Sequence, residues 1–360
     1  MNIAEFRQAH PEVHFLDPAD IAGLGRHLAA RGGLAPDETI LSATRAGDGN
    51  MNCVLRVKTS TRSLVVKQSR PWVEKYPQFE APWDRALREA EFYRLIAPFE
   101  NIARRMPRLL AADPESRILV LEDLGRHGDF SDLYKGRTMA LGEIAVLAGF
   151  LSALHTAFDE GPPPFPFPNR EMRELNHAHI FTIPFQPGNG LDLDAFCPGL
   201  AACARPFVED VALREMSVQL GRECYLADGP CLLHGDFFPG SLVRTPKGPQ
   251  VLDPEFGFFG RPEFDVAVFA AHLLLAHQPA GSIAMFLRGY QPRPDFNVLR
   301  MRQLAGIEIF RRILGYAQLP LPSGLLLRQE LLEIARQLVL RPKGTVATTL
   351  FSPAPSPSFP

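Results

Sequence analysis

The chain has 360 residues, of which 46% are hydrophobic and 22% are charged, a balance typical of a globular protein with a sizeable buried core. Its net charge of -2 gives no electrostatic reason to expect nucleic acid or an anionic membrane as the main partner. The length favours two domains rather than one.

The cysteines and the apolar stretches argue against a disulfide-stabilised or zinc-ribbon protein and against a membrane protein. The five cysteines form no C-x-x-C pair, so the sequence indicates neither a zinc ribbon nor a disulfide framework, and we expect reduced thiols. The N-terminal residues do not resemble a signal peptide, and the longest apolar stretches are shorter than the roughly 18–20 residues that a membrane helix requires. We therefore expect a cytoplasmic protein.

The first third of the chain is rich in strand patterns. A short helix is expected at 18–31, followed by strand, glycine turn and strand at 38–59. Residues 62–69 are apolar and β-branched, which predicts a third strand, and another strand is expected at 116–125. An amphipathic helix is expected at 83–99.

The remainder of the chain is mainly helical in pattern. Helices are expected at 138–158, 206–227, 264–277, 299–317 and 324–340. Proline-rich segments at 161–168 and 352–360 interrupt or follow these patterns. We therefore predict a strand-rich N-terminal domain at 1–123 with a hinge at its end, a mainly helical domain at 124–345, and a disordered tail at 346–360.

Three acidic residues in one short region, Asp236, Asp253 and Glu255, are candidates for a metal-binding and catalytic site. "LLHGDF" and "QVLD" are expected to be two short strands joined by the turn "TPKGP", with Asp236 after the first strand and Asp253 at the end of the second. Because alternate residues of an extended chain point the same way, Asp253 and Glu255 can direct both carboxylates to one point. Hard oxygen ligands of this kind suit Mg²⁺. Asp236 could then accept a proton from an attacking hydroxyl.

This order matches the template of enzymes that transfer phosphoryl groups, which has H-R-D, then Asn, then D-F-G. His234-Gly235-Asp236 takes the first place, Ser241 takes the place of the Asn as a weaker metal ligand, and Asp253-Pro254-Glu255 takes the last. A second His-Gly-Asp at 127–129 has no D-x-E after it, so we interpret it as structural.

Other parts of the template are expected earlier in the chain. A phosphate-binding turn is expected at 46–52, and the strand lysine Lys67 is expected to reach the phosphates. Either Glu89 or Glu91, on the following helix, is expected to hold that lysine. The carbonyl of Glu122 and the amide of Leu124 are expected to contact adenine. Each part has an ordinary structural explanation when taken alone, so the order of the parts is the evidence.

With these motifs in place, the sequence resembles the aminoglycoside phosphotransferase and choline kinase superfamily, and within it the 5-methylthioribose kinases, over residues 40–318. The matching motifs are Gly47-Asp48-Gly49-Asn50-Met51-Asn52, Lys67-Gln68, Asp84-Arg85-Ala86 with Glu89, Glu122-Asp123-Leu124, His234-Gly235-Asp236 with Ser241, "DPEFGFFG" and the pair Arg311-Arg312. One departure is "HGDFFPGS", in which the family's histidine after the His-Gly-Asp motif is absent.

The resemblance implies an α+β, protein-kinase-like bilobal fold. The β-rich N-terminal lobe at 1–123 would bind the nucleotide, and the mainly helical C-terminal lobe at 124–345 would be the catalytic and acceptor-binding lobe. It implies ATP and Mg²⁺ as cofactors and phosphorylation of the 1-hydroxyl of 5-methylthioribose in methionine salvage. The implied nucleotide-binding residues are Gly47, Asp48, Gly49, Asn50, Asn52, Lys67, Glu89, Glu122 and Leu124. Asp236 would be the base, Asp253, Glu255 and Ser241 the metal ligands, and Arg311 and Arg312 would contact the acceptor together with Asp236.

Two alternatives stay open at this stage. The first is a kinase of the same fold that acts on another acceptor, such as choline, homoserine, a sugar or an aminoglycoside. The second is a nucleotide-binding protein without turnover. No G-x-x-x-x-G-K-[ST] motif is present, which argues against a P-loop enzyme. We expect ATP and a small-molecule acceptor as partners and no nucleic acid or membrane, and a homodimer is left open.

Overall fold

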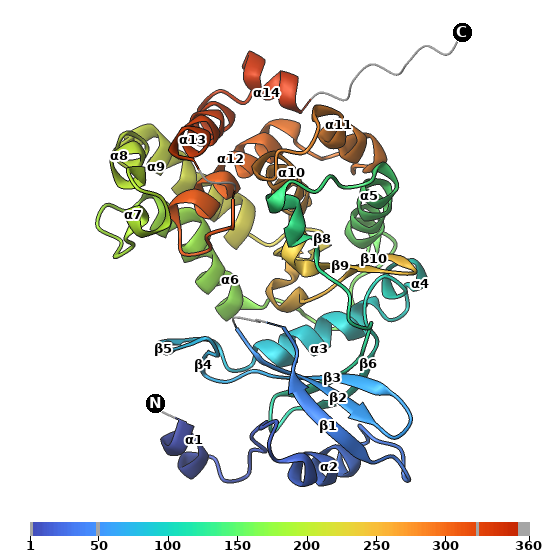
Figure 1. Ribbon diagram of the computed structural model, residues 1–360. Helices are drawn as coiled ribbons and strands as arrows, with labels where there is room; N and C mark the ends of the chain where they lie inside the picture. Colours follow the sequence, from blue (N-terminus) through green and yellow to red (C-terminus); the bar gives the residue numbers. More distant parts are fainter. Residues whose placement is uncertain (1–2, 48–50, 322–323, 352–360) are drawn as a thin grey trace. The chain divides into compact units, whose positions relative to one another are not determined.

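The computed structural model describes residues 3–47, 51–321 and 324–351. The chain forms two compact units, of which the first comprises residues 1–127 and 252–255 and the second comprises 128–251 and 256–360 (Figure 1). The boundary predicted from the sequence is at residue 123, and that prediction assigns 252–255 to the second domain, whereas these residues are part of the first unit. This segment contains Asp253 and Glu255, so both carboxylates are part of the first unit.

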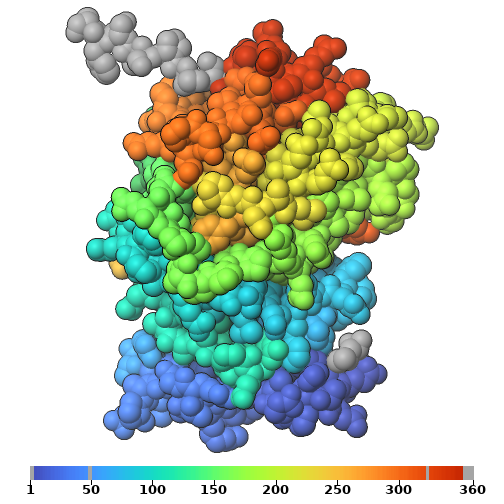
Figure 2. All heavy atoms as spheres, turned by 180° about the vertical axis from the view of Figure 1, so that it is seen from behind, coloured from blue at the N-terminus to red at the C-terminus, as the bar shows by residue number. Residues whose placement is uncertain are grey.

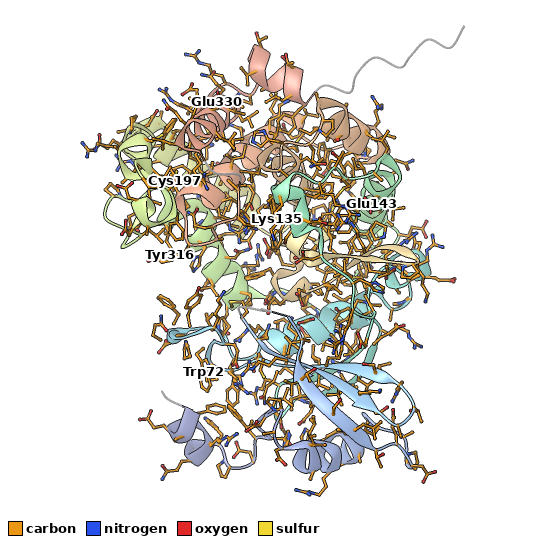
Figure 3. The ribbon with its side chains drawn as sticks, in the orientation of Figure 1. Trp72, Lys135, Glu143, Cys197, Tyr316 and Glu330 are labelled. Carbon is orange, nitrogen blue, oxygen red and sulfur yellow. The ribbon has the colours of Figure 1, made fainter. Side chains whose placement is uncertain are left out.

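The first unit is built on a five-stranded antiparallel sheet with the strand order β1-β2-β3-β7-β6. Its strands are β1 (Ile40–Arg45), β2 (Cys53–Thr59), β3 (Ser63–Gln68), β6 (Leu109–Asp113) and β7 (Ile118–Glu122). A small hairpin of β4 (Trp72–Val73) and β5 (Tyr76–Glu80) follows β3, and its Trp72 is buried (Figure 3). The helices of this unit are α1 (Ile3–Ala9), α2 (Ile21–Ala30), α3 (Arg85–Ile96) and α4 (Glu100–Ala103).

The two faces of this sheet have different chemistry. Alternate apolar residues of β2 and β3, among them Leu55 and Val66, form one core with Leu24 and Leu28 of α2. Neighbouring residues on a strand point to opposite faces, so Lys67 is directed away from this core. Its side chain lies against α3, which runs along the sheet (Figure 1). The alternation in "LVVKQ" therefore delivers one cation to a buried position.

The second unit is mainly helical. Its helices are α5 (Leu141–Thr156), α6 (Arg170–His177), α7 (Leu193–Phe196), α8 (Leu200–Val208), α9 (Val211–Leu220), α10 (Glu263–Leu275), α11 (Ala280–Gly289), α12 (Val298–Leu314), α13 (Leu325–Leu340) and α14 (Thr345–Leu350). Helix α12 packs between α10 and α13, and α5 packs on α11 (Figure 1). Almost every residue of α10 is buried, so this helix passes through the core of the unit.

Two pairs of short strands hold the loops of the second unit, and their pairing corrects one expectation. The strands are β8 (Cys231–Leu233), β9 (Leu242–Thr245), β10 (Gly248–Val251) and β11 (Phe258–Gly260). We expected "LLHGDF" to pair with "QVLD". Instead β9 pairs with β10 and β8 pairs with β11, because the turn at 246–247 closes a tight hairpin on the immediately preceding residues.

Two other expectations are wrong in detail. The single helix expected at 206–227 is divided into α8 and α9, because the side chain of Asp210 accepts a hydrogen bond from the amide of Leu213 and starts a new helix. The disordered tail was expected to begin at residue 346, but α14 continues to Leu350 and buries Ala347 and the following Phe351. Residues 352–360 lie outside the described residues.

The predicted α+β fold, with a strand-rich N-terminal part and a mainly helical C-terminal part, is confirmed. Across residues 3–47, 51–321 and 324–351, no helix combines the length and the apolar character needed to cross a membrane.

Candidate active site

Lys67 is the centre of a buried charge cluster in the first unit. Its Nζ lies 2.5 Å from Oε2 of Glu89 on α3, 2.9 Å from Oδ1 of Asp253 and 4.0 Å from Oε2 of Glu255. The structure thus brings together four predicted site residues. It also decides between the two candidate glutamates, because Glu91 pairs with Arg88 instead.

Burial and charge act against each other in this cluster. Burial alone would lower the pKa of Lys67, but the carboxylates of Asp253, Glu89 and Glu255 outweigh it and raise that pKa. Burial raises the pKa of Glu89 to about 7, although the neighbouring Lys67 acts to lower it. Lys67 is therefore a cation at neutral pH.

Asp253 and Glu255 differ in exposure although they are only two residues apart. The Asp253 side chain is 55% exposed, whereas Glu255 is buried and its Oε2 accepts a hydrogen bond from Nδ2 of Asn52 at 2.7 Å. The backbone of Asp253 adopts φ +58°, a left-handed conformation that few residues other than glycine adopt. Such conformations concentrate at functional sites.

The donor set around Asp253 fits a divalent cation of the magnesium type. In the part of the chain that the structure describes, no three His, Cys, Asp or Glu residues are grouped to hold a metal ion. Mg²⁺ usually takes only one or two carboxylates and completes its shell with water and substrate phosphates. Asp253 and Glu255 are such a pair, and the exposure of Asp253 leaves room for a ligand.

Arg85 supports this cluster, and the sequence analysis did not assign it a role. The residue is fully buried, and its guanidinium donates hydrogen bonds to the carbonyls of Met51, Arg70, Trp72 and Pro82. Its Nε lies 3.9 Å from Oε2 of Glu255. A single side chain thus connects the end of the predicted phosphate-binding turn with the β4–β5 hairpin and the D-x-E segment. Its place in the Asp-Arg-Ala motif was the only available signal.

For the other residues predicted to contact the nucleotide, the structure shows few or no contacts that bear on that role. Asp48, Gly49 and Asn50 lie outside the described residues, while Gly47 has φ +70° and open space where a side chain would be. Glu122 ends β7 and pairs with Arg108, and Leu124 follows it in the connection out of the sheet. The roles of these residues toward a nucleotide stay predictions.

Asp236 lies in the second unit, on a loop held by a carboxylate. The amides of His234 and Gly235 donate hydrogen bonds to the two carboxylate oxygens of Asp265 on α10, at 2.7 and 3.0 Å. Gly235 has φ +83°, and a Cβ there would lie 2.1 Å from the carbonyl oxygen of Phe256, so only glycine fits. The His-Gly-Asp motif is thus a tightly fixed turn that presents Asp236.

Both arginines predicted to contact the acceptor, Arg311 and Arg312, form hydrogen bonds with Asp236. Nη1 of Arg311 and Nη2 of Arg312 each donate to Oδ1 of Asp236 at 3.1 Å. Within the described ranges Oδ2 of Asp236 makes no hydrogen bond, and the side chain is 14% exposed. The structure therefore brings together three predicted residues that are 75 and 76 positions apart in the chain.

The arginines are themselves buried and need further partners. Glu308, one turn earlier on α12, contacts both guanidiniums, and Oδ1 of Asn176 accepts from Nη2 of Arg311 at 3.2 Å. Neither Glu308 nor Asn176 was identified from the sequence. The spacing of Glu308 three and four residues before the arginines was the available signal.

The two remaining predictions concern Ser241 and the second His-Gly-Asp motif. The hydroxyl of Ser241 donates to the carbonyl of Asp236 at 3.0 Å, which gives the serine a structural contact within the loop. Asp129 accepts from the amide of Ser131 and caps a short 3-10 helix at Phe130–Lys135, in agreement with a structural role for this copy.

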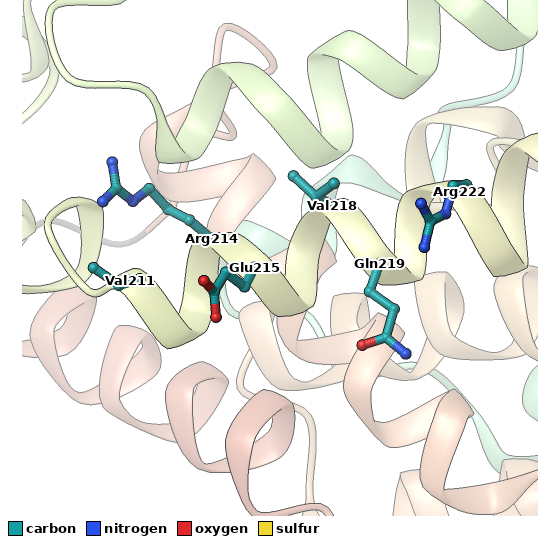
Figure 4. A pocket seen from close by; sticks show the side chains of 6 residues that line it. All are labelled: Val211, Arg214, Glu215, Val218, Gln219 and Arg222. Atoms are coloured by element: carbon teal, nitrogen blue, oxygen red, sulfur yellow. The ribbon is translucent and has the colours of Figure 1, made fainter.

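A surface groove of about 510 Å³ lies along α9 and contains none of the predicted site residues (Figure 4). Its lining residues are Val211, Arg214, Glu215, Val218, Gln219 and Arg222. This region forms part of the outer surface of the second unit (Figure 2), and Val211 and Val218 are both more than half exposed.

We expect Lys67→Met to destabilise the first unit by about 3–5 kcal/mol at pH 8, because it leaves Glu89 buried without a cation. The loss should be smaller at pH 6. Since burial already raises the pKa of Glu89 above its unfolded value, the folded state binds the proton more tightly, and stability falls as the pH rises toward about 7. Removing Lys67 strengthens this trend. Urea unfolding of the variant at both pH values measures it.

The double variant Lys67→Met/Glu89→Gln is the matched control. It should recover most of the lost stability and show no such pH trend. An equal loss for the single variant at pH 6 and pH 8 would show that Glu89 does not depend on Lys67.

The chain is similar to known proteins in both sequence and fold. The model of the phosphotransferase enzyme family matches residues 42–304. A methylthioribose kinase from Exiguobacterium sibiricum is 28% identical over 264 residues, which are 69% of this chain and 64% of that protein. A methylthioribose kinase from Pectobacterium carotovorum is 31% identical over 262 residues, which are 68% of this chain and 62% of that protein. The match thus spans less than two thirds of the length of these relatives.

A solved choline kinase from Streptococcus pneumoniae has a TM-score of 0.51 at 14% identity, over 88% of this chain and 97% of that one. This likeness concerns the fold, and it confirms the predicted protein-kinase-like fold. Because the family model covers residues 42–304, well over half of the chain, the chain belongs to the phosphotransferase enzyme family.

Proposed function

We propose that this protein is an ATP-dependent small-molecule kinase that phosphorylates the 1-hydroxyl of 5-methylthioribose. The observation that supports it most is the contact of Asp236 with two buried arginines, because this places a carboxylate and two fixed cations at one point. The names of the relatives, methylthioribose kinases at 28–31% identity, supply the acceptor.

The first unit supplies the nucleotide side of the proposed reaction. Lys67, held by Glu89, would bind phosphate oxygens of ATP, and Asp253 with Glu255 would hold Mg²⁺. The cation, when bound, would neutralise charge on the phosphates and leave the terminal phosphorus open to attack. Asn52 fixes Glu255 in place through its hydrogen bond.

The second unit supplies the acceptor side. Oδ2 of Asp236 would accept the proton of the acceptor hydroxyl while the oxygen of that hydroxyl attacks the terminal phosphorus of ATP. ADP would leave as the bond to its terminal oxygen breaks. Arg311 and Arg312 hold Oδ1 and orient the carboxylate. Their guanidiniums offer forks of donors that match diols and phosphoryl oxygens. The proposed transfer thus needs groups of both units.

The charge balance around Asp236 bears on the class of acceptor. The two guanidiniums face two carboxylates, those of Asp236 and Glu308, so the cluster is formally neutral. A cationic acceptor such as choline or an aminoglycoside would meet two arginines without an excess of acidic groups. A neutral polyhydroxylated molecule such as methylthioribose fits this balance, and another neutral sugar is the second candidate.

An acceptor screen tests the proposal. ATP consumption should be measured with methylthioribose, related pentoses, homoserine, choline and aminoglycosides. We expect the highest kcat/KM with methylthioribose and little turnover with the cationic acceptors, because the carboxylates of this cluster are already paired with the two guanidiniums and offer no excess negative charge to bind a cation. Preferred turnover of choline or an aminoglycoside would contradict the acceptor assignment, and ATP binding without turnover of any acceptor would favour a non-catalytic protein.

Asp236→Asn tests the role of the base. The amide keeps the shape of the carboxylate but cannot accept the hydroxyl proton, so kcat should fall by roughly 10²–10⁴-fold. ATP affinity, measured by calorimetry, should change by less than about twofold, because the groups that bind ATP in this proposal belong to the first unit. A kcat within about threefold of the wild-type value would remove Asp236 from the role of base.

A further inference from the structure

Glu308 is the common partner of every cation around Asp236. Its Oε1 lies 2.6 Å from Nε of Arg312, and its two oxygens lie 3.4 and 3.3 Å from Nη1 of Arg311. Oε1 also lies 3.0 Å from Nε2 of His272. The side chain is 1% exposed, so these contacts are made without competition from water.

Because the cluster is buried, its stability depends on whether each positive charge has a negative partner. Two guanidiniums removed from water are costly unless each has a counter-ion. Asp236 alone would leave one of them uncompensated, and Glu308 supplies the second negative charge from the same helix. Burial acts to raise the pKa of Glu308, but Arg311 and Arg312 outweigh it and lower that pKa, so the residue stays ionised.

His272 completes the arrangement from α10. Its Nδ1 lies 2.5 Å from the hydroxyl of Tyr134, and its Nε2 faces Glu308. Burial lowers the pKa of His272 to about 4, so the ring is neutral at pH 7. In the neutral ring that satisfies both contacts, Tyr134 donates to Nδ1 and Nε2–H donates to Glu308. His272 therefore adds a hydrogen bond without adding a third positive charge.

Phe238 contacts both Arg312 and His272. The guanidinium carbon of Arg312 lies 4.4 Å from the centre of the Phe238 ring, and that ring lies 5.3 Å from the ring of His272. The aromatic face thus makes a cation–π contact with Arg312 in addition to its ion pairs.

From these contacts we propose that Glu308, supported by His272, is a positioning residue that holds Arg311 and Arg312 against Asp236. This inference rests on the proposed kinase function. Glu308 contacts neither ATP nor acceptor in this account, and it acts only through the arginines. A loose guanidinium pair would misplace Asp236 and the transferring phosphoryl group, and such misplacement by about 1 Å can cost about 100-fold in rate.

Glu308→Gln tests the proposal, because it keeps the shape of the side chain and removes the charge. We expect kcat/KM for the acceptor to fall about 100-fold while the KM for ATP changes less than about twofold. Glu263→Gln is the matched control. Glu263 is an equally buried glutamate on α10 whose Oε1 accepts from the amide of Asn297 at 2.7 Å. It should lose stability but keep both kinetic constants.

Substitutions of His272 separate positioning from packing. His272→Gln keeps an N–H donor for Glu308, whereas His272→Leu keeps only the bulk. We expect the leucine variant to show the same selective loss of acceptor kcat/KM, and the glutamine variant to retain most of the wild-type value. Equal losses for both, or a Glu308→Gln enzyme that matches Glu263→Gln in every kinetic constant, would overturn the proposal.

A measurement that does not require enzymatic turnover tests the role of Glu308 independently of the proposed function. Nuclear magnetic resonance can follow the Nε–H of Arg312, which donates to Glu308. In wild-type protein this hydrogen should exchange slowly, and in Glu308→Gln it should exchange at least tenfold faster, while Glu263→Gln leaves it unchanged. If no acceptor is phosphorylated, the proposed function fails, but this result still decides whether Glu308 holds the arginine. Unchanged exchange in Glu308→Gln would overturn the proposal.

Discussion

The structure depends on the neutralisation of buried cations. Lys67 in the first unit and the pair Arg311 and Arg312 in the second are almost inaccessible to water, and each would cost several kcal/mol if left unpaired. In both units a carboxylate on a helix pairs with the buried cation. Glu89 faces Lys67 from α3, and Glu308 faces the arginines from one turn earlier on α12. In each case the remaining carboxylates, Asp253 and Asp236, are the more exposed members of their clusters.

This division explains how a stable core and a chemical site use the same residues. The buried carboxylate stabilises the cation, and in the proposed function the more exposed one is available to substrate or metal. Backbone geometry supports the exposed members: Asp253 has a left-handed conformation, and Asp236 follows a glycine that no other residue could replace. Asp265 then fixes the amides of the His-Gly-Asp turn, so the orientation of Asp236 is set before any ligand binds.

The sequence predicted those parts of the site that are determined by local pattern. Strand alternation directed Lys67 away from the core, and the helix after it offered Glu89. The His-Gly-Asp and D-x-E motifs identified Asp236, Asp253 and Glu255. Arg85, Asp265 and His272 were missed, because their roles arise from partners that are brought close only by the tertiary fold. Likewise, the pairing of β8 with β11 could not be inferred from the run of apolar residues, since another short strand lay nearer in the chain.

The most direct test of this account is the dependence of ATP affinity on Mg²⁺ and on Asp253. Calorimetry should show that Mg²⁺ strengthens ATP binding by wild-type protein, and that Asp253→Asn reduces the affinity for the magnesium complex at least tenfold, because the exposed carboxylate is then no longer a metal ligand. An Asp253→Asn protein that binds ATP as tightly as wild type, with and without Mg²⁺, would contradict the assignment of the Lys67 cluster to nucleotide and metal.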